Sequence, residues 1–311
     1  MPHWLIKSAA HRVISWLPNS QWWNEQFQRH VTRSLDLSDG SFEMRLRLTQ
    51  RYFELYAATP PGQRTSGFTT LELGTGWYPV VPIGLWLCGA DRNWTYDITP
   101  LLNADRLRAT LTKFADAARD NALRALLPAA QPDRVEQLDV LCKRSAAEDP
   151  IALLASIGIE VRIQDAQNSG LLPDSVDLFT STSVLEYIPR PALTALWGEF
   201  ARIAKPGAVS AHFINLGDQY RHFDRKLSAV NFLRFTERQW RLFNSPLVPL
   251  TRLRHSDYLG LFQTTGWHVI HDEKTHAAAS ALETIPLAPE FRGYAKDDLL
   301  VLTALITAKL R

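Results

Sequence analysis

The sequence predicts an α/β fold, a mostly parallel sheet with helices on both of its faces. Short apolar and β-branched runs alternate with longer helical patterns from residue 68 to the end of the chain. One of these runs, residues 69–73, breaks into a glycine loop at Gly74 and Gly76. A buried strand, a glycine turn and a helix start are typical of a ligand site at the carboxyl edge of such a sheet.

The remaining elements follow from the same patterns. Helical stripes cover residues 4–17 and 42–56, and a long helical stretch at 101–127 is followed by shorter pieces at 135–141 and 151–157. A helix is expected at 191–204, and a polar connection at 272–297. Strands are expected at 93–98, 159–163, 176–181, 209–216, 266–270 and 299–310.

These elements suggest a division of the chain. We expect a helical extension over 1–67, packed on a core domain over 68–311 that carries a helical insertion at about 100–157. The extension is rich in tryptophan, including Trp22 and Trp23. It could form a lid, a peripheral contact with a membrane, or aromatic packing against the core, and packing is favoured because aromatic rings bury large areas.

Composition excludes several classes of protein. Hydrophobic residues make up 46% of the chain and charged residues 21%, as in a globular protein, and the net charge of +2 gives no overall attraction to nucleic acid. Cys88 and Cys142 lack the spacing of metal ligands or of a disulfide framework. No apolar run is long enough to span a bilayer, and no signal peptide is visible. We therefore expect a cytoplasmic protein.

The glycine loop departs from the dinucleotide fingerprint, because Pro79 stands where the third glycine would be. Asp97 ends the second strand, 23 residues after Gly74, and its carboxylate could accept hydrogen bonds from two ribose hydroxyls. The alternative is that Asp97 caps the turn before Pro100.

A series of motifs stands in order along the core. It comprises E-L-G-T-G from Glu72, the acid Asp97, D-A at Asp165, L-P-D-S-V-D-L, S-V-L-E-Y-I-P and E-x-x-R-I-x-K-P-G. The series resembles the class I S-adenosylmethionine (SAM)-dependent methyltransferases, nearest the type 11 group. The resemblance implies a Rossmann-like sheet of seven strands with the last strand antiparallel, and SAM as cofactor.

The resemblance also implies roles for matching positions. Three residues would flank the methionyl part of SAM: Glu72, Gly74 and Gly76. Asp97 would bind the ribose, and Asp165 and Ala166 would contact the adenine. Thr182 and Ser183 would lie under the sulfonium. Tyr78 departs from the family, since many members have glycine there, and the insertion after Asp97 is long.

The acceptor is predicted from the stretch after the fifth strand. Residues 219–255 contain eight bases against two acids: Arg221, Arg225, Lys226, Arg234, Arg238, Arg241, Arg252 and Arg254 against Asp224 and Glu237. This excess indicates either a pocket wall for a small anionic acceptor or a solvated helix face. No RNA-binding module is visible, so a nucleic-acid acceptor is not expected.

The catalytic prediction is a proton acceptor for O- or N-methyl transfer. His222 is the first candidate, oriented by Asp224 or Asp218, because neutral imidazole accepts protons near pH 7. His212 and His255 are weaker candidates. No metal site is predicted, and C-methylation stays open. The alternatives in other classes are an NAD(P)-dependent oxidoreductase and a non-catalytic subunit that binds SAM.

Overall fold

The computed structural model describes residues 13, 36–60, 65–222, 224–244 and 249–310, and of His222 only the backbone. The expected helix at 4–17 and the pair Trp22–Trp23 lie outside the described residues, so the lid, membrane and packing hypotheses for them stay untested.

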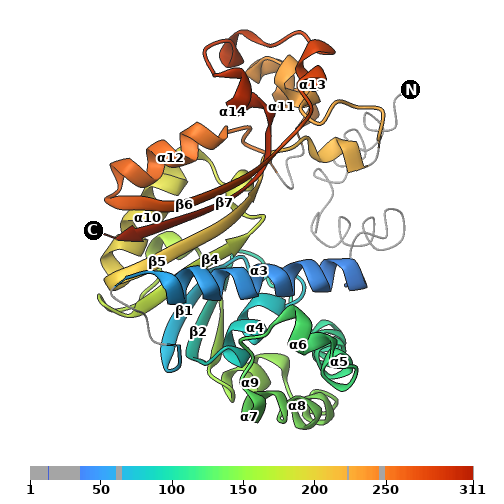
Figure 1. Cartoon of the computed structure of the whole chain (residues 1–311), viewed down its shortest axis with the longest axis vertical. Coiled ribbons are helices and arrows are strands. Elements are labelled where there is room, and N and C mark those ends of the chain that lie inside the picture. Colours follow the sequence, from blue (N-terminus) through green and yellow to red (C-terminus); the bar gives the residue numbers. More distant parts are fainter. Residues whose placement is uncertain (1–12, 14–35, 61–64, 223, 245–248, 311) are drawn as a thin grey trace.

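A seven-stranded sheet runs through the molecule in the order β3-β2-β1-β4-β5-β7-β6 (Figure 1). Its strands are β1 (Phe68–Leu73), β2 (Ala90–Asp97), β3 (Ile159–Ile163), β4 (Val176–Thr182), β5 (Ala204–Asn215), β6 (Trp267–His276) and β7 (Val301–Leu310). The first five pair in parallel, whereas β7 is antiparallel to both β5 and β6. The predicted fold class is therefore confirmed, including the antiparallel last strand.

The helices flank this sheet. They are α3 (Asp39–Ala58), α4 (Val80–Leu87), α5 (Ala104–Arg119), α6 (Ala122–Leu126), α7 (Pro132–Val135), α8 (Leu138–Arg144), α9 (Pro150–Ala155), α10 (Arg190–Ile203), α11 (Glu237–Phe243), α12 (His255–Thr264), α13 (Ser280–Glu283) and α14 (Lys296–Leu300). Short 3-10 turns are η2 (Ala166–Asn168), η3 (Leu185–Tyr187), η4 (Gln219–His222), η5 (Asn231–Arg234) and η6 (Pro289–Phe291).

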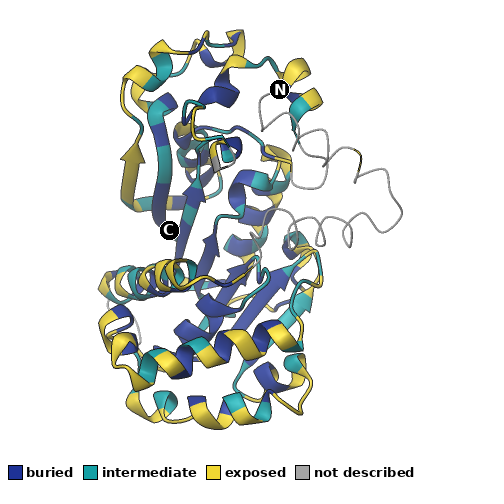
Figure 2. Cartoon of the chain, turned by 90° about the vertical axis from the view of Figure 1, so that its right-hand side faces the viewer, coloured by how far each residue is buried: buried dark blue, intermediate teal, exposed yellow. Residues whose placement is uncertain are grey.

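The central strands of the sheet are mostly buried (Figure 2), and their alternating side chains build a core on each face of the sheet. Phe179 of β4 packs with Trp197 and Phe200 of α10 on one face. Its neighbour Leu178 belongs to the opposite core, with Tyr52 and Tyr56 of α3. Helix α3 thus packs on the sheet as expected of the extension, while the domain boundary at residue 67 stays a prediction.

Helices α5 to α9 lie between β2 and β3, and the helical stretch expected at 101–127 is not continuous. Helix α5 ends at Arg119, and Asn121 takes a left-handed φ of 58° before α6 begins. Leu107, Leu111 and Phe114 of α5 pack with the α4 core. The break turns the chain so that α6 also reaches this core.

The polar connection expected at 272–297 is also wrong. Strand β6 extends to His276, and Ile285, Ala288 and Phe291 are buried in a small core beyond the end of the sheet. This unit, which we call the cap, consists of η4, η5, α11, α13, η6 and α14 (Figure 1, top). Its apolar residues are spaced without helical or strand periodicity, so the sequence pattern did not identify them.

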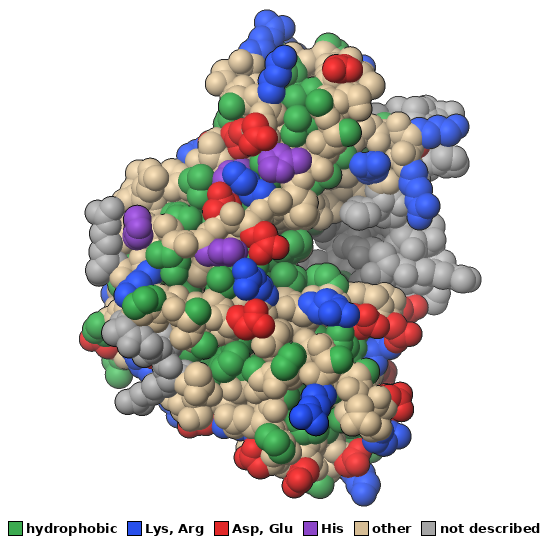
Figure 3. Space-filling view, in the orientation of Figure 1, with side chains coloured by type: hydrophobic (Ala, Val, Ile, Leu, Met, Phe, Trp, Pro, Cys, Tyr) green, Lys and Arg blue, Asp and Glu red, His purple; other side chains and the backbone are tan. Residues whose placement is uncertain are grey.

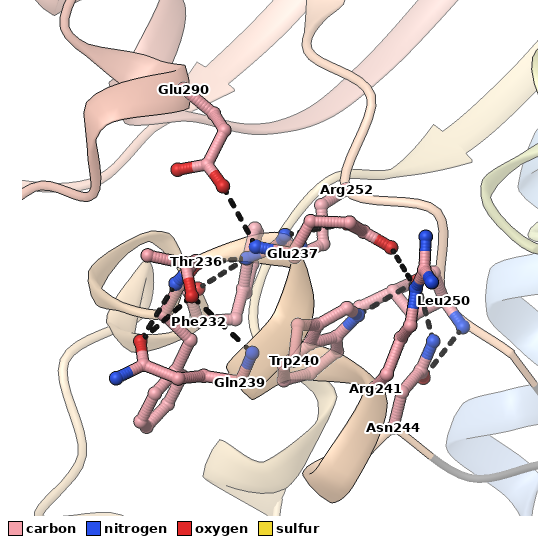
Figure 4. Close-up of polar contacts among 11 residues, drawn as sticks. Phe232, Thr236, Glu237, Gln239, Trp240, Arg241, Asn244, Leu250, Arg252 and Glu290 are labelled. Carbon is pink, nitrogen blue, oxygen red and sulfur yellow. Dashed lines mark hydrogen bonds and ion pairs between the residues drawn. The ribbon is translucent and has the colours of Figure 1, made fainter.

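Two arginines of the basic stretch hold the cap together and join it to the sheet. Arg252 Nη1 donates to the carbonyls of Phe232 at 3.1 Å and Phe235 at 2.5 Å, and its Nη2 donates to Glu237 at 2.8 Å (Figure 4). Arg254 is fully buried and donates to the carbonyls of Leu216 and Val301 at 2.9 and 2.7 Å. These two bases are therefore structural and do not belong to an anion-binding wall.

Candidate active site

The glycine loop lies at the carboxyl edge of the sheet, between β1 and α4. The N–H groups of Gly74 and Thr75 donate to the carbonyl of Tyr96 on β2, at 2.7 and 3.3 Å. Gly74 and Gly76 have φ of 88° and 62°, which side chains other than glycine rarely adopt. A Cβ at Gly74 would lie 2.4 Å from Cγ2 of Val184, whereas a Cβ at Gly76 would meet nothing closer than 4.0 Å.

Glu72 lies under this loop and is buried. Its Oε2 accepts a hydrogen bond from Thr95 Oγ1 at 2.9 Å, and Thr95 Oγ1 lies 2.6 Å from Thr75 Oγ1. Burial raises the pKa of Glu72 to about 8, against the opposing effects of Thr95 and of the positive charge on Arg45. Glu72 thus supports the loop from below and is mostly protonated at neutral pH.

Asp97 joins the loop to the end of β2. Its Oδ2 accepts from the N–H of Gly76 at 2.9 Å and its Oδ1 from the N–H of Thr99 at 3.0 Å. The turn-capping role is therefore real. A carboxylate has about four acceptor positions, so this role leaves two for the hydroxyls of a ribose.

Asp165 and Ala166 lie beyond the end of β3. Asp165 is exposed and caps η2, accepting from the N–H and the side-chain amide of Gln167 at 2.9 and 2.7 Å. Ala166 is buried in the sheet core. Strands β1 and β3 lie about 10 Å apart across β2, so one ligand that touches both must extend along the edge.

Thr182 and Ser183 stand at the end of β4, beside the glycine loop. The Tyr52 hydroxyl of α3 donates to the carbonyl of Ser181 at 2.8 Å and lies 3.0 Å from Thr182 Oγ1. Ser183 has φ of 55° and donates its N–H to the carbonyl of Phe213 on β5. Such strained positions concentrate at functional sites.

The predicted catalytic residues follow β5, in and beside η4. Asp218 is buried and accepts from the N–H of Tyr220 at 2.8 Å and from Asn231 Nδ2 at 3.3 Å, and burial raises its pKa to about 6. Asp224 is half-buried and accepts from the N–H of Lys226 at 3.2 Å. The His222 side chain lies outside the described residues, so the assignment stays a prediction. Asp218 is engaged in holding its loop, which leaves Asp224 as the better orienting group.

The other histidines occupy structural positions. His212 is fully buried between Ser181 Oγ at 2.8 Å and Ser210 Oγ at 2.5 Å, and burial lowers its pKa to about 3. His255 Nε2 lies 2.8 Å from Asp272 Oδ1. In the part of the chain that the structure describes, no three His, Cys, Asp or Glu side chains cluster as metal ligands, and no helix is long and apolar enough to cross a membrane.

Two further residues at this edge were given no role from the sequence. One is Arg45 of α3, whose pKa is lowered by burial and raised by the electrostatic effects of Glu72 and Tyr52. Arg45 shares the side of α3 that carries the buried residues Phe42, Leu46 and Tyr52. Charged residues are rare on such an apolar stripe, so the sequence alone could have marked Arg45 as a functional candidate.

The second residue is Glu186, in η3 after Ser183. Its side chain is 1% exposed, and neither carboxyl oxygen has a hydrogen-bond partner of normal geometry. Burial raises its pKa to about 8, partly offset by its own N–H and that of Asn215. A cavity of about 10 Å³ separates η3 from residues 250–253 and the end of β5. Unsatisfied buried carboxyls are costly, which makes Glu186 a functional candidate.

We expect Glu186→Gln to raise the melting temperature relative to the wild type, increasingly so from pH 5 to pH 8. The folded-state pKa of about 8 lies above the ordinary value of 4.5, so the stability contributed by protonated Glu186 is complete below pH 4.5 and is lost as pH rises through 8. Glutamine stays neutral and avoids this loss. Thermal unfolding at several pH values tests this, with the exposed Glu136→Gln as control. A difference that does not change with pH would contradict the assigned pKa.

Comparisons with known proteins give only a likeness of fold. No protein family model matches the sequence, and no curated protein matches it. A solved putative sarcosine dimethylglycine methyltransferase from Galdieria sulphuraria is 14% identical, with 85% of each chain covered and a TM-score of 0.47.

Two other solved structures are similar to the same degree. The geranyl diphosphate C-methyltransferase from Streptomyces coelicolor is 10% identical, with 85% of this chain and 76% of that one covered and a TM-score of 0.46. A chain of the Haloferax volcanii complex of the Trm112 activator and a putative methyltransferase is 16% identical, with 92% and 96% covered and a TM-score of 0.45.

TM-scores of this size do not assign the fold. The assignment rests on the strand order and strand directions of the sheet. The sheet has the order β3-β2-β1-β4-β5-β7-β6, and its seven strands with an antiparallel last strand are the arrangement that the motif series implied. It differs from the order 3-2-1-4-5-6 of the dinucleotide-binding fold. The chain has the fold of the class I SAM-dependent methyltransferases.

Proposed function

We propose that the protein is a SAM-dependent methyltransferase. The observation that carries the proposal is the glycine loop at the carboxyl edge of β1, clamped to Asp97 of β2 and adjoining the strained end of β4. The space beside Gly76 is open, so the main chain there can approach a ligand.

The residues at this edge fit the parts of SAM. Gly74, Gly76 and Glu72 would adjoin the methionyl group, and the free acceptor positions of Asp97 would take the ribose hydroxyls. Asp165 and Ala166, two strands away, would adjoin the adenine. SAM would supply a methyl group already activated on a positive sulfonium, near Thr182 and Ser183.

The protein's own part in the reaction would be to align the acceptor and remove its proton. His222 and Asp224 follow β5, which neighbours β4, so we expect them on the acceptor side of the site. Glu186 is a second candidate for the proton, because it lies between the ends of these two strands with no hydrogen-bond partner. O- or N-methylation needs such a group.

The acceptor would be a small molecule. A groove of about 410 Å³ between α3 and β5, β7 and β6 is floored by Met44, Leu48, Phe213 and Leu305, and this volume is typical of sites for small ligands. Phe213 is the register partner of Thr182, so the groove adjoins the expected position of the methyl group.

An anionic acceptor, as opposed to nucleic acid, also stays a proposal. Arg252 and Arg254 are structural and do not support an anionic acceptor. The support comes from three exposed bases near η4, which are Arg221, Arg225 and Lys226. The rim of the groove carries Arg47, Arg51 and Lys274 with Glu43 and Glu273. Figure 3 shows bases and acids interspersed on this face, with no continuous basic surface.

Ligand-induced thermal stabilisation tests the proposal. SAM and S-adenosylhomocysteine should raise the melting temperature, by an amount that grows with the logarithm of concentration above the Kd, and NAD should not. Stabilisation by NAD alone would show an oxidoreductase. Binding of SAM without formation of S-adenosylhomocysteine from any acceptor would indicate a non-catalytic subunit.

A further inference from the structure

Arg45 is a charged residue on the apolar side of α3, and none of the described acids forms an ion pair with it. It lies on the sheet-facing side of α3, among Phe42, Leu46, Thr49 and Tyr52. Its Nε is buried and has no hydrogen-bond partner, and no acid among the described residues is within ion-pair distance of its guanidinium. Burial of this Nε without a hydrogen-bond partner is costly, because it belongs to a charged group.

The surroundings of Arg45 do not remove this cost. Glu72 is the acid with the largest electrostatic effect on Arg45. Its own burial raises its pKa to about 8 and so keeps it mostly protonated at neutral pH. Tyr52, the other group that acts on Arg45, keeps its hydroxyl proton and points it at the carbonyl of Ser181. The charge on Arg45 is therefore left for a ligand.

The position of Arg45 says which part of a ligand it can reach. Glu72 precedes the glycine loop on β1, and Tyr52 contacts Thr182 at the end of β4. Arg45 acts on both, so it stands over the carboxyl edge where the loop meets the end of β4. A cofactor at this edge has one negatively charged group near the loop, the α-carboxylate of its methionyl part.

We propose that Arg45 binds the α-carboxylate of SAM. The inference rests on the proposed function, and it adds to the cofactor site a residue from outside the motif series. A planar guanidinium can donate two parallel hydrogen bonds to a carboxylate, and such charge-assisted pairs are strong where water is excluded. The extension containing α3 is then part of the cofactor site.

The test compares ligands with and without the carboxylate. Arg45→Met keeps the length of the side chain and removes its charge. By calorimetry, its affinity for SAM should fall about 10–100-fold, the range of one or two hydrogen bonds to a charged group. Its affinity for 5′-methylthioadenosine and for decarboxylated SAM, which lack the carboxylate, should be equal to the wild type's or tighter.

Controls separate binding from folding. Arg124→Met, an exposed base on α6, should bind all three ligands as the wild type does. Arg45→Lys should recover part of the lost affinity for SAM. The melting temperature of Arg45→Met without ligand should be equal or higher, because an unpaired charge leaves the interior.

Two results would overturn the proposal: an unchanged affinity for SAM in Arg45→Met, or an equal loss for the ligands that lack the carboxylate, which would indicate a structural role. Failure of the wild type to bind SAM at all is a different outcome, which removes the proposed function itself.

Discussion

Gly74→Ala should destabilise the fold and remove measurable SAM binding, whereas Gly76→Ala should be much milder in its effect on stability. Both substitutions place a side chain at positive φ, which costs ~1–2 kcal/mol. Only the Cβ at Gly74 also overlaps another atom, Cγ2 of Val184 at 2.4 Å. Overpacking of this kind adds ~1–3 kcal/mol, so the total is a large part of the stability of a typical domain.

The cause of this effect lies within the protein. A side chain at Gly74 would clash first with Val184, the residue before η3. Denaturant unfolding of Gly74→Ala, Gly76→Ala and the double variant Gly74→Ala/Val184→Ala measures the effect. The double variant should regain the part of the unfolding free energy that Gly74→Ala loses to overpacking against Val184. Equal destabilisation by the two single glycine variants would contradict the account.

His222→Ala should lower the rate of methyl transfer by about 10²–10⁴-fold, the usual contribution of a general base, with SAM affinity nearly unchanged. Asp224→Asn should cause a smaller loss, since it would orient the imidazole. Asp218→Asn should instead lower the melting temperature, because Asp218 holds Tyr220 and Asn231 in their loop.

The decisive comparison for catalysis is His222→Ala with Glu186→Gln, each assayed at saturating SAM with one acceptor. Loss of rate only in the histidine variant supports His222 as the proton acceptor. Loss only in the glutamate variant transfers that role to Glu186. Gln219→Ala, in the same turn η4, is the control for disturbance of the turn.

The strands and the cofactor loop could be predicted from the sequence because their signals are local. A β-branched run followed by Gly74 specifies a strand and its turn, and β1 was predicted to within a residue. The fifth strand is expected at 209–216, whereas β5 spans Ala204–Asn215. Lys205 in its first part donates from Nζ to Asp177 at 2.5 Å, a tertiary contact that no local pattern encodes.

The missed residues share one cause. Arg254 and Arg252 look like surface bases in the sequence, and only their hydrogen bonds to carbonyls of separate elements show that they are buried. Glu186 was noticed as part of a motif, but its lack of partners depends on β5 and on residues 250–253 closing over it. Tertiary packing decides whether a charged side chain is exposed, paired, or buried without a partner.

The most direct test of SAM binding at this edge is calorimetric titration of SAM into the wild type and into Asp97→Ala. The wild type should bind one SAM per chain. Asp97→Ala should bind it ~1–3 kcal/mol more weakly, about 5–150-fold, because hydrogen bonds to a charged group are lost while the fold is kept. Equal affinity in the two proteins, with circular dichroism confirming an unchanged fold, would show that the cofactor site lies elsewhere, and no binding by the wild type would contradict the account as a whole.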